Sequence, residues 1–306
     1  MNSAAFYRTY HGHEVSHLEA VFNALSQVVP GLDAAAAAVP RSVVFLAGDS
    51  SLDNKYWLAT REPAVNGYDR ALKPPFSVPD IAHQLNKIFA VMGGSCVAVN
   101  GAVEESTIDC RTGGALQPQD VFIRDHITEN DVLVVSLGGN DIALKPTFKT
   151  IMNMGWLARL SRTDNVADGS AWGLSHFFDL IHSELELYLR AVTAKRKPRL
   201  IVPCMIYYPD ANPKSESWAG RVLDLIGYNA SPRHLQTVID RVFREAFVDK
   251  PVVVPGSRVV PIQLSRVLDG SDSSDYVARV EPSEKGGAKM ARLIVDTIAQ
   301  HGTLPT

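Results

Sequence analysis

Two short polar motifs in this sequence follow apolar runs and carry residue types that can perform acyl chemistry. The first, Gly48–Ser50, reads Gly-Asp-Ser and directly follows Val43–Ala47. The second, Gly138–Asp141, reads Gly-Gly-Asn-Asp and directly follows Val132–Leu137. A serine at a tight turn after a strand exposes its hydroxyl for attack on a carbonyl carbon, and its backbone N–H can help to bind the oxyanion that forms. The side-chain amide of Asn140 could donate to the same oxygen, so the two motifs together predict nucleophilic attack with oxyanion stabilisation.

These motifs need a scaffold that brings two strand ends together, and the apolar runs predict one. The expected strands are Val43–Ala47, Cys96–Val99, Val132–Ser136, Leu200–Cys204 and Val252–Val254. Helical patterns alternate with them at Ile81–Met92, Pro118–Ile127, Leu174–Thr193 and Leu235–Phe247. Strands without polar alternation, separated by helices, are typical of a parallel sheet covered on both faces. We therefore expect a doubly wound (flavodoxin-like) α/β fold, with a five-stranded parallel sheet in a three-layer α/β/α arrangement.

The carboxyl ends of the strands are where such sheets bind ligands, and both polar motifs leave their strands at that edge. Two long segments, Lys145–Gly169 and Tyr207–Tyr228, are candidates for lids or substrate walls, or for simple packing on the sheet edge. The last helix is expected from about Pro282 to Gln300, since proline suits a first helical turn. The sequence therefore places a candidate site and its possible covers at one edge of the sheet.

Two regions are expected along the chain. Residues 1–40 should form an N-terminal helical extension packed on the domain, because apolar residues recur there at helical spacing: Val15, Leu18, Phe22 and Leu25. Residues 41–306 should form the domain that carries both motifs.

Composition excludes several classes of function. The chain has 306 residues, of which 46% are hydrophobic and 21% charged, with a formal net charge of −3, so nothing favours a nucleic acid or an anionic membrane surface as partner. No apolar stretch approaches the ~20 residues of a membrane span. The N-terminal segment Met1–Arg8 lacks the apolar region of a secretory signal, so we expect an intracellular protein. A small-molecule partner and no cofactor are expected, and the oligomeric state stays open.

A competing motif occurs near the N-terminus, where His13–His17 reads His-Glu-x-x-His. In zinc proteases two histidines one helical turn apart bind the metal and the glutamate activates water. At ~100° per residue, however, both histidines fall nearly opposite the apolar face marked by Val15 and Leu18. We therefore expect surface histidines here, and no metal site.

With Ser50 and Asn140 each following a core strand, the sequence resembles the SGNH (GDSL-type) hydrolases, from about Val43 to Ile298. That family carries serine, glycine, asparagine and histidine in four separated blocks on a doubly wound sheet. The resemblance implies that Ser50 is the nucleophile and that the substrate is an ester or acyl compound. It also implies an oxyanion hole made of the Ser50 amide, the Asn140 side chain and the amide of a glycine in the second block.

The second block departs from the family pattern. It follows its strand at Asn100–Thr107, but Glu105 lies where the usual glycine belongs. Glu105 keeps a backbone N–H while losing the freedom of φ that glycine has. We count the backbones of Glu105 and Gly139 among the candidate oxyanion donors and expect the Glu105 carboxylate to point away from the oxyanion. Asn100 belongs to the residues that shape the site.

Two aspartates also belong to the residues that shape the site. Asp49 and Asp141 follow strands, and aspartates in such loops commonly fix turns by accepting hydrogen bonds from backbone N–H groups. An alternative is an acidic pocket, formed with Glu105 and Glu281, that holds a divalent metal or a cationic ligand. Both interpretations stay open at this point.

The last block lacks the family's Asp-x-x-His-Pro pattern. Aligning on Pro282–Gly286 places Glu281 at the histidine position and Ala278 at the aspartate position. Shifting the register to use Asp275 places Ala278 at the histidine position instead. No histidine occurs between His234 and His301, so the standard triad is absent, and His176 is the best of the alternative histidines elsewhere in the chain.

Glu281 can serve in three ways: as a structural residue, as a direct base or as a ligand-binding group. A free glutamate has a pKa of about 4.3 against about 6.5 for imidazole, so it is the weaker base at neutral pH. Burial or a second carboxylate raises that pKa, whereas a helix N-terminus after it lowers it. The leading hypothesis is thus a divergent serine hydrolase with Glu281 as an atypical base. A catalytically silent ligand-binding protein, and acyl-transfer or carboxylate-based chemistry on the same scaffold, are the alternatives.

Overall fold

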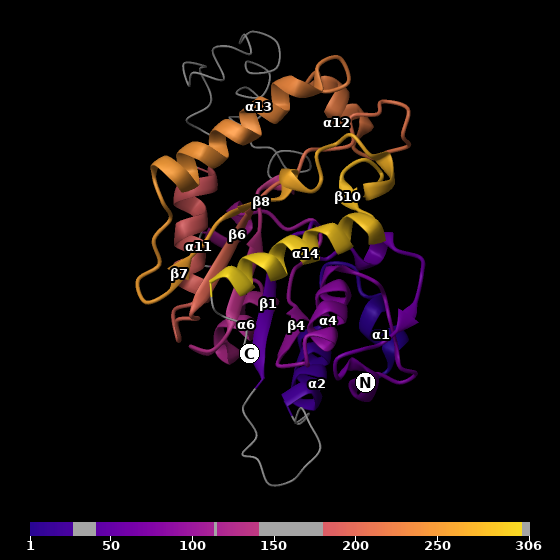
Figure 1. Ribbon diagram of the computed structural model, residues 1–306, viewed down its shortest axis with the longest axis vertical. Coiled ribbons are helices and arrows are strands. Elements are labelled where there is room, and N and C mark those ends of the chain that lie inside the picture. The colour runs from indigo at the N-terminus through magenta and orange to yellow at the C-terminus, as the bar shows by residue number, and fades with distance from the viewer. Residues whose placement is uncertain (27–40, 113–114, 141–179, 302–306) are drawn as a thin grey trace.

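A parallel sheet forms the centre of the protein (Figure 1). The computed structural model describes residues 1–26, 41–112, 115–140 and 180–301. Within them the strands run in the order β4-β1-β5-β6-β7, and β8 also pairs with β6. Their bounds are β1 Ser42–Gly48, β4 Cys96–Asn100, β5 Val132–Ser136, β6 Leu200–Met205, β7 Arg258–Val259 and β8 Ile262–Gln263. All of these pairings are parallel, which confirms the predicted parallel α/β sheet.

The edge of the sheet beside β6 differs from the prediction. Val252–Val254 is not a strand, and two short strands, β7 and β8, occupy that edge instead. Val252 and Val254 are buried in the core all the same. Pro251 and Pro255 flank the run, and proline has no N–H to donate to a strand ladder. The apolar run Val252–Val254 therefore indicated burial correctly, but it did not indicate pairing as a strand.

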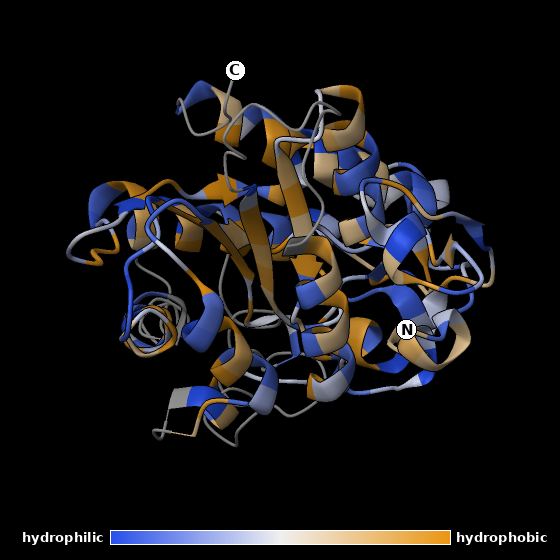
Figure 2. Ribbon diagram, turned by 90° about the horizontal axis from the view of Figure 1, so that it is seen from below, coloured by the Kyte–Doolittle hydropathy of each residue, from blue (hydrophilic) through white to orange (hydrophobic). Residues whose placement is uncertain are grey.

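Helices cover both faces of the sheet, as expected for three α/β/α layers. One face packs against α4 (Ile81–Val91) and α14 (Glu284–Gln300). The other packs against α1 (Ser3–Arg8), α2 (Val15–Ser26), α6 (Pro118–His126), α11 (Leu185–Val192) and α13 (Pro232–Phe243). Successive residues of β1 point to opposite faces, so Phe45 joins one core and Leu46 the other. Figure 2 shows the strands as apolar ribbons between the helical layers.

Most predicted helices are confirmed within a few residues. The run predicted at Leu174–Thr193 is described from residue 180 onward, as a π-helical turn over Leu180–Glu184 followed by α11. The run predicted at Leu235–Phe247 is α13 followed by π-helical turns over Arg244–Asp249. The last helix begins later than expected, at Glu284, because Glu281–Pro282 forms the short strand β10, which pairs with β9 (Tyr276–Val277). Ser283 is its N-cap, and the Ser283 hydroxyl accepts a hydrogen bond from the Gly286 N–H at 3.1 Å.

Smaller elements complete the described chain. These are the helices α3 (Tyr68–Ala71), α5 (Asp109–Thr112) and α12 (Gly220–Leu225), and the strand pairs β2 (Glu62–Pro63) with β3 (Phe76–Ser77) and β9 (Tyr276–Val277) with β10 (Glu281–Pro282). Leu18, Val21 and Leu25 of α2 are buried in the same core as Phe45. The separation of residues 1–40 from the domain stays a prediction, since 27–40 lie outside the described residues. Among the described helices, none has an apolar stretch long enough to span a bilayer.

A close backbone approach fixes the turn that carries the first polar motif, and it can be tested. Gly48 has φ 143°, and a Cβ there would lie 1.9 Å from the Ser136 carbonyl oxygen. We expect Gly48→Ala to lower the free energy of unfolding by at least about 3 kcal/mol, from overpacking and backbone strain together, as measured by urea unfolding.

Gly220→Ala is the matched control for this substitution. A Cβ at Gly220 meets its nearest neighbour, Ser217 Cβ, at 4.0 Å. Because alanine favours the helix that begins there, this variant should match the wild-type stability or exceed it by up to about 1 kcal/mol. Equal stabilities for the two variants would contradict the role given to Gly48.

Candidate functional site

Ser50 and Glu281 meet beyond the carboxyl end of β1. The Ser50 hydroxyl donates a hydrogen bond to Glu281 Oε1 at 3.2 Å. Both residues are buried, with 8% and 3% of their surface exposed. The structure thus brings the predicted nucleophile and the residue at the histidine position into direct contact across 231 positions of sequence.

Asp49 fixes the turn that presents Ser50. Its N–H donates to the Ser136 carbonyl of β5 at 3.1 Å, and its Oδ1 accepts from the Ser51 N–H at 3.0 Å. The Ser51 hydroxyl lies 2.6 Å from Asp49 Oδ1 and 2.7 Å from Ser136 Oγ. Burial raises the pKa of Asp49, while its hydrogen bonds with Ser51 act in the opposite direction. Asp49 therefore binds the turn, and Ser50 alone of these two serines faces Glu281.

The carboxyl group of Glu281 is held in an environment that disfavours its charge. Burial, together with the neighbouring carboxylates of Asp49 and Glu104, raises the pKa of Glu281 to about 8, although the hydrogen bond from Ser50 lowers it. Its second oxygen, Oε2, is buried and has no hydrogen-bond partner among the described residues. Of the two opposing effects expected from the sequence, burial is the larger, because Glu281 precedes the Ser283 N-cap and lies in β10 rather than in the helix.

No carboxylate among the described residues stands behind Glu281 as the aspartate of a triad would. Ala278, at the predicted aspartate position, has a left-handed φ of 48°, and its carbonyl accepts from the Ser217 hydroxyl. Asp275 is buried and pairs with Lys289 Nζ at 2.5 Å, while its carbonyl accepts from the Ser283 N–H at 2.9 Å. Asp275 therefore secures the start of α14.

Histidines from elsewhere in the chain have other contacts. His83 Nε2 lies 2.9 Å from Glu62 Oε2, and ring nitrogens of His126 and His182 lie against the carbonyls of Phe122 and Ala246. His176 lies outside the described residues. Glu281 is thus the titratable group that the described chain places on the Ser50 hydroxyl.

The candidate oxyanion donors all line cavities that adjoin Ser50. Asn140 is buried, and its side-chain amide donates to the Ser106 carbonyl at 3.0 Å, which fixes its orientation. Glu105 has a φ of 57°, so it adopts the left-handed conformation that a glycine at this position would favour. Gly139 lines the same pocket as Ser50 and Asn140. Asp141 lies outside the described residues.

Asn100 links the loop that carries Ser50 to the loop that follows β4. Its amide nitrogen donates to the Leu52 carbonyl at 3.0 Å, and its oxygen accepts from the Ala102 N–H at 3.0 Å. Asn100 therefore acts on the site through the two loops that it joins, after β1 and after β4.

A buried arginine that the sequence analysis did not single out supports the second block. Arg111 donates to Asp120 Oδ2 at 2.8 Å, to Ser106 Oγ at 2.6 Å and to the Gly48 carbonyl at 3.1 Å. The Tyr188 hydroxyl donates to the other oxygen of Asp120 at 2.7 Å. Arg111 thus ties the loop that holds Glu105 to the strand end that carries Ser50.

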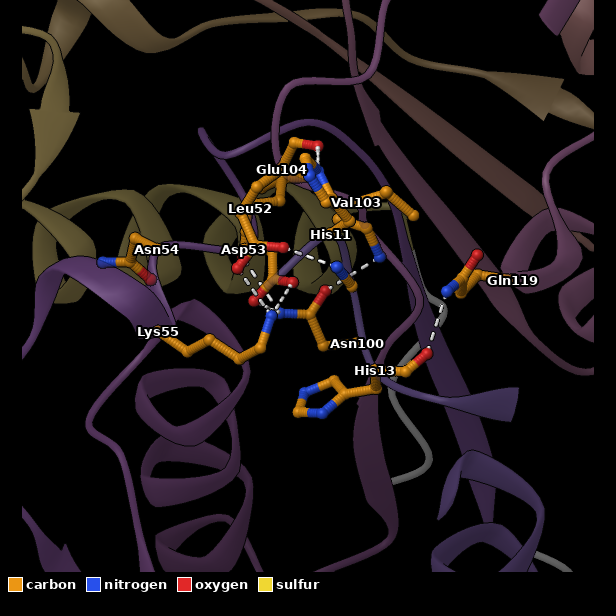
Figure 3. A network of polar contacts seen from close by, with 12 residues as sticks. His11, His13, Leu52, Asp53, Asn54, Lys55, Asn100, Val103, Glu104 and Gln119 are labelled. Carbon is orange, nitrogen blue, oxygen red and sulfur yellow. Dashed lines mark hydrogen bonds and ion pairs between the residues drawn. The ribbon is translucent and has the colours of Figure 1, made fainter. Parts of the chain in front are cut away.

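A second buried network ties the N-terminus to the site. Figure 3 shows Lys55 pointing toward Asp53 and Glu104, and all three side chains are fully buried or nearly so. Lys55 Nζ lies 2.6 Å from Glu104 Oε1, and the other oxygen of Glu104 accepts from the Gly12 N–H at 2.5 Å. The segment around Gly12 is therefore fastened to the loop that follows β4.

One histidine of the His-Glu-x-x-His motif, His13, differs from expectation, whereas His17 is partly exposed on α2. His13 is only 1% exposed, and its ring stacks on Phe6 at 4.0 Å between centroids. Burial lowers its pKa. The expectation of a surface position was wrong for His13 because α2 begins at Val15, so His13 does not lie on that helix.

Metal-ligating atoms do come together elsewhere, at His13, Asp53 and Asp80, within 4.8 Å of one another. Asp53 already pairs with the Lys55 ammonium, and a buried cation beside a ligand opposes metal binding. We therefore derive no metal chemistry from this cluster.

Two cavities meet at Ser50 and Glu281. The first, of about 110 Å³, is mainly apolar and is walled by Trp218, Ala219, Val222, Leu223, Ile226, Leu235 and Ile239. The second, of about 240 Å³, is lined by Tyr10, Ser50, Trp57, Glu105, Trp218 and Glu281. Part of the segment Tyr207–Tyr228 therefore does form a wall of the site, whereas Lys145–Gly169 lies outside the described residues.

Comparison with known proteins gives a likeness of fold. No protein-family model matches the sequence, and no curated protein matches it. The similar solved structures include a carbohydrate esterase family 3 from Talaromyces cellulolyticus (13% identity, 85% of this chain and 97% of that chain, TM-score 0.41). Another is an esterase from Pseudoalteromonas sp., with 13% identity over 85% of this chain and 98% of that chain and a TM-score of 0.44. A third is a proposed SGNH hydrolase from Slackia heliotrinireducens, with 10% identity over 84% of this chain and 99% of that chain and a TM-score of 0.46. The last of these carries the name of the group that the motifs indicated, but these identities and TM-scores are too low to indicate the chemistry at Ser50.

The state of Glu281 predicts a pH-dependent stability. Between the ordinary pKa of 4.5 and the folded value of about 8, the unfolded chain ionises Glu281 while the folded protein keeps it protonated. Wild-type stability should therefore fall as the pH rises through this window, by about 1.4 kcal/mol per unit from this group. Glu281→Gln removes the titration, so the free energy of unfolding of the variant relative to wild type should rise by roughly 4–5 kcal/mol between about pH 5 and pH 9.

Urea unfolding of wild type and Glu281→Gln across this pH range measures the difference between their free energies of unfolding. The contributions of all other titrating groups are common to both proteins and cancel in this difference. Glu129→Gln, which changes an exposed glutamate, is the control and should show a constant difference. A constant difference for Glu281→Gln as well would mean that Glu281 is ionised throughout.

Proposed function

We propose that the protein is a serine hydrolase that cleaves an ester or related acyl bond, with Ser50 as nucleophile and Glu281 as general base. The hydrogen bond from Ser50 Oγ to Glu281 Oε1 at 3.2 Å is the observation that carries the proposal. This distance is at the edge of the range that direct proton transfer needs, and such contacts often tighten when substrate binds.

The reaction follows from that contact. Ser50 Oγ forms a bond to the acyl carbon as its proton passes to Glu281, and the carbonyl electron pair moves onto oxygen. Collapse of the tetrahedral intermediate breaks the bond to the leaving alcohol, which takes the proton from Glu281. Water then repeats the sequence on the acyl-serine, releases the acid and restores Ser50 and ionised Glu281.

A carboxylate becomes an adequate base here because of its burial. With a pKa of about 8, ionised Glu281 is a stronger base than an ordinary imidazole of pKa about 6.5. The cost is that only about a tenth of the protein carries the ionised form at pH 7. A raised pKa thus replaces part of what a histidine would supply, at the expense of activity below pH 8.

Stabilisation of the oxyanion is assigned to Ser50, Asn140 and the backbone amides of Glu105 and Gly139. A side-chain amide has two N–H donors, so the contact of Asn140 with the Ser106 carbonyl leaves a second donor for the oxyanion. Such donors alone leave about 10³–10⁴-fold catalysis over water when a triad is incomplete. Measurable turnover is therefore expected without an aspartate behind the base.

One observation favours an alternative, a catalytically silent protein that binds a ligand in the same cavities. Glu281 Oε2 has no partner among the described residues, so nothing there orients the base. Acyl transfer to an alcohol other than water, or carboxylate-based chemistry at Glu281, would use the same contact. Substrate turnover separates these functions.

The nucleophile is tested with short-chain aryl esters. Ser50→Ala should reduce kcat/KM by at least about 10³-fold, because the covalent intermediate can no longer form. Ser51→Ala is the matched control, since its hydroxyl contacts Asp49 and Ser136, and it should keep measurable turnover. Equal turnover by wild type and Ser50→Ala, both folded by circular dichroism, would refute the proposed mechanism.

The base is tested by the pH dependence of kcat/KM. Wild-type activity should rise nearly tenfold per pH unit below about pH 8 and level off above it, as Glu281 ionises. The double variant Glu281→His with Ala278→Asp should move the midpoint toward about 6.5, and aspartate tolerates the left-handed φ of position 278. An inert wild type that gains activity through this double substitution would instead establish the silent alternative.

A further inference from the structure

The second cavity beside Ser50 combines aromatic rings with carboxyl groups. Its volume is about 240 Å³, and its lining consists of Tyr10, Trp57, Trp218, Glu105, Glu281 and Ser50 itself. No lysine, arginine or histidine is part of this lining among the described residues. The walls therefore offer aromatic rings and, at Glu105, a carboxylate in the same cavity as Ser50.

A hydrogen bond and ring contacts hold these groups in place. The Tyr10 hydroxyl donates to Glu105 Oε1 at 2.9 Å, and the Tyr10 ring lies 4.6 Å from that of Tyr56. The rings of Trp57 and Trp218 lie 6.5 Å apart at an interplanar angle of 22°. Glu105 lines the cavity, and the hydrogen bond from Tyr10 holds its carboxylate in place.

The charge of the cavity is not cancelled by the buried lysine of the nucleophile loop. Lys55 is fully buried and is engaged by Asp53 and Glu104. Burial raises the pKa of the Tyr10 hydroxyl, and the carboxyl groups of Glu105, Glu104 and Glu281 raise it further. Glu105, which accepts the hydrogen bond from Tyr10, is therefore the carboxylate that gives this cavity its negative charge.

We propose that this cavity binds a cationic alkylammonium group of the substrate. Aromatic faces attract a cation through their quadrupoles, and quaternary ammonium groups are the ligands that such aromatic walls recognise best. The Glu105 carboxylate adds a direct charge attraction, and the same negative potential repels anionic substrates.

The position of the two cavities extends this assignment to a substrate class. Ser50, Glu281 and Trp218 line both the apolar cavity and the aromatic–acidic one. A carbonyl at Ser50 would thus have one substituent in apolar surroundings and the other beside aromatic rings and a carboxylate. The substrate is an ester with an apolar chain and a cationic group on opposite sides of the scissile bond, and this class rests on the proposed hydrolase function.

Matched ester pairs test the substrate class. Butyrylcholine is compared with the neutral ester in which a tert-butyl group replaces the trimethylammonium group, so shape stays constant while charge changes. A second pair carries the same exchange in the acyl half, esterified with butanol. In one of the two pairs, kcat/KM should be at least about tenfold higher for the cationic ester. Equal rates within both pairs would overturn the assignment.

Variants show whether the preference arises in this cavity. Glu105→Gln and Trp57→Leu should each reduce the ratio of cationic to neutral kcat/KM by about three- to tenfold. Glu129→Gln also removes one negative charge, but it is exposed and lies before β5, at the end of the strand opposite the site. It should keep the wild-type ratio, and an equal loss of ratio in Glu129→Gln would mean that overall charge causes the preference.

Binding without turnover separates this inference from the proposed function. Tetramethylammonium should quench the tryptophan fluorescence of Ser50→Ala saturably, whereas tert-butanol should not. Addition of Trp57→Leu should abolish the response, and addition of Glu105→Gln should weaken binding by about three- to tenfold. Tetramethylammonium binding with no ester turnover would overturn the hydrolase while keeping the cation site. Turnover without binding or preference would overturn the cation site alone.

Discussion

The carbonyl oxygen of Gly48 is the point on which the site depends. It accepts from the Val103 N–H at 2.8 Å, the Ser106 hydroxyl at 3.0 Å and the Arg111 guanidinium at 3.1 Å. The turn at Ser50 and the loop that carries Glu105 are therefore set relative to each other through one acceptor. A buried guanidinium is tolerated only when its donors and charge are satisfied, and Asp120 and Tyr188 complete that requirement from two helices behind the sheet.

A buried charge must be compensated by charged or hydrogen-bonding partners, and this requirement explains why the pKa of Glu281 is raised. Lys55 is buried with two carboxylate partners, and Arg111 with one carboxylate and two neutral acceptors, whereas Glu281 has one hydrogen bond and one unpartnered oxygen. Incomplete compensation is expressed as a raised pKa rather than as a fixed charge. The charged groups that brace the site are thus paired, and Glu281, in contact with Ser50, is a group whose charge is disfavoured.

The sequence predicted the scaffold well and the surroundings of the site poorly. Val132–Ser136 was predicted with its final bounds, because parallel strands are buried on both faces and give uninterrupted apolar runs. The run Val252–Val254 carried the same signal, but its flanking prolines keep it out of the sheet. The prediction of a surface position for His13 was wrong because the helical period was extended to two residues before the start of α2.

Contacts between distant residues could not be read from local patterns. Nothing in the spacing of Tyr10, Glu105 and Trp218 indicates a shared cavity, and the pairing of Lys55 with Glu104 depends on two loops meeting after their strands have paired. The positions of Ser50 and Asn140 were accessible because strand ends in a parallel sheet share one edge, and that of Glu281 only through the family resemblance. The sequence did not indicate which partners surround these side chains, and those partners decide which of the side chains are charged.

The tie between Gly12 and Glu104 has a consequence for how the protein acquires its site. The cavity walls come from positions 10, 50, 105, 218 and 281, so the chain must close loops over nearly its whole length before any of them is complete. Bringing such distant segments together costs chain entropy, and this cost is offset only when the core is complete. The cavity at Ser50 is consequently a property of the fully assembled chain, and loosening the first dozen residues would remove Tyr10 from its wall and Phe6 and Tyr7 from the core beside the sheet.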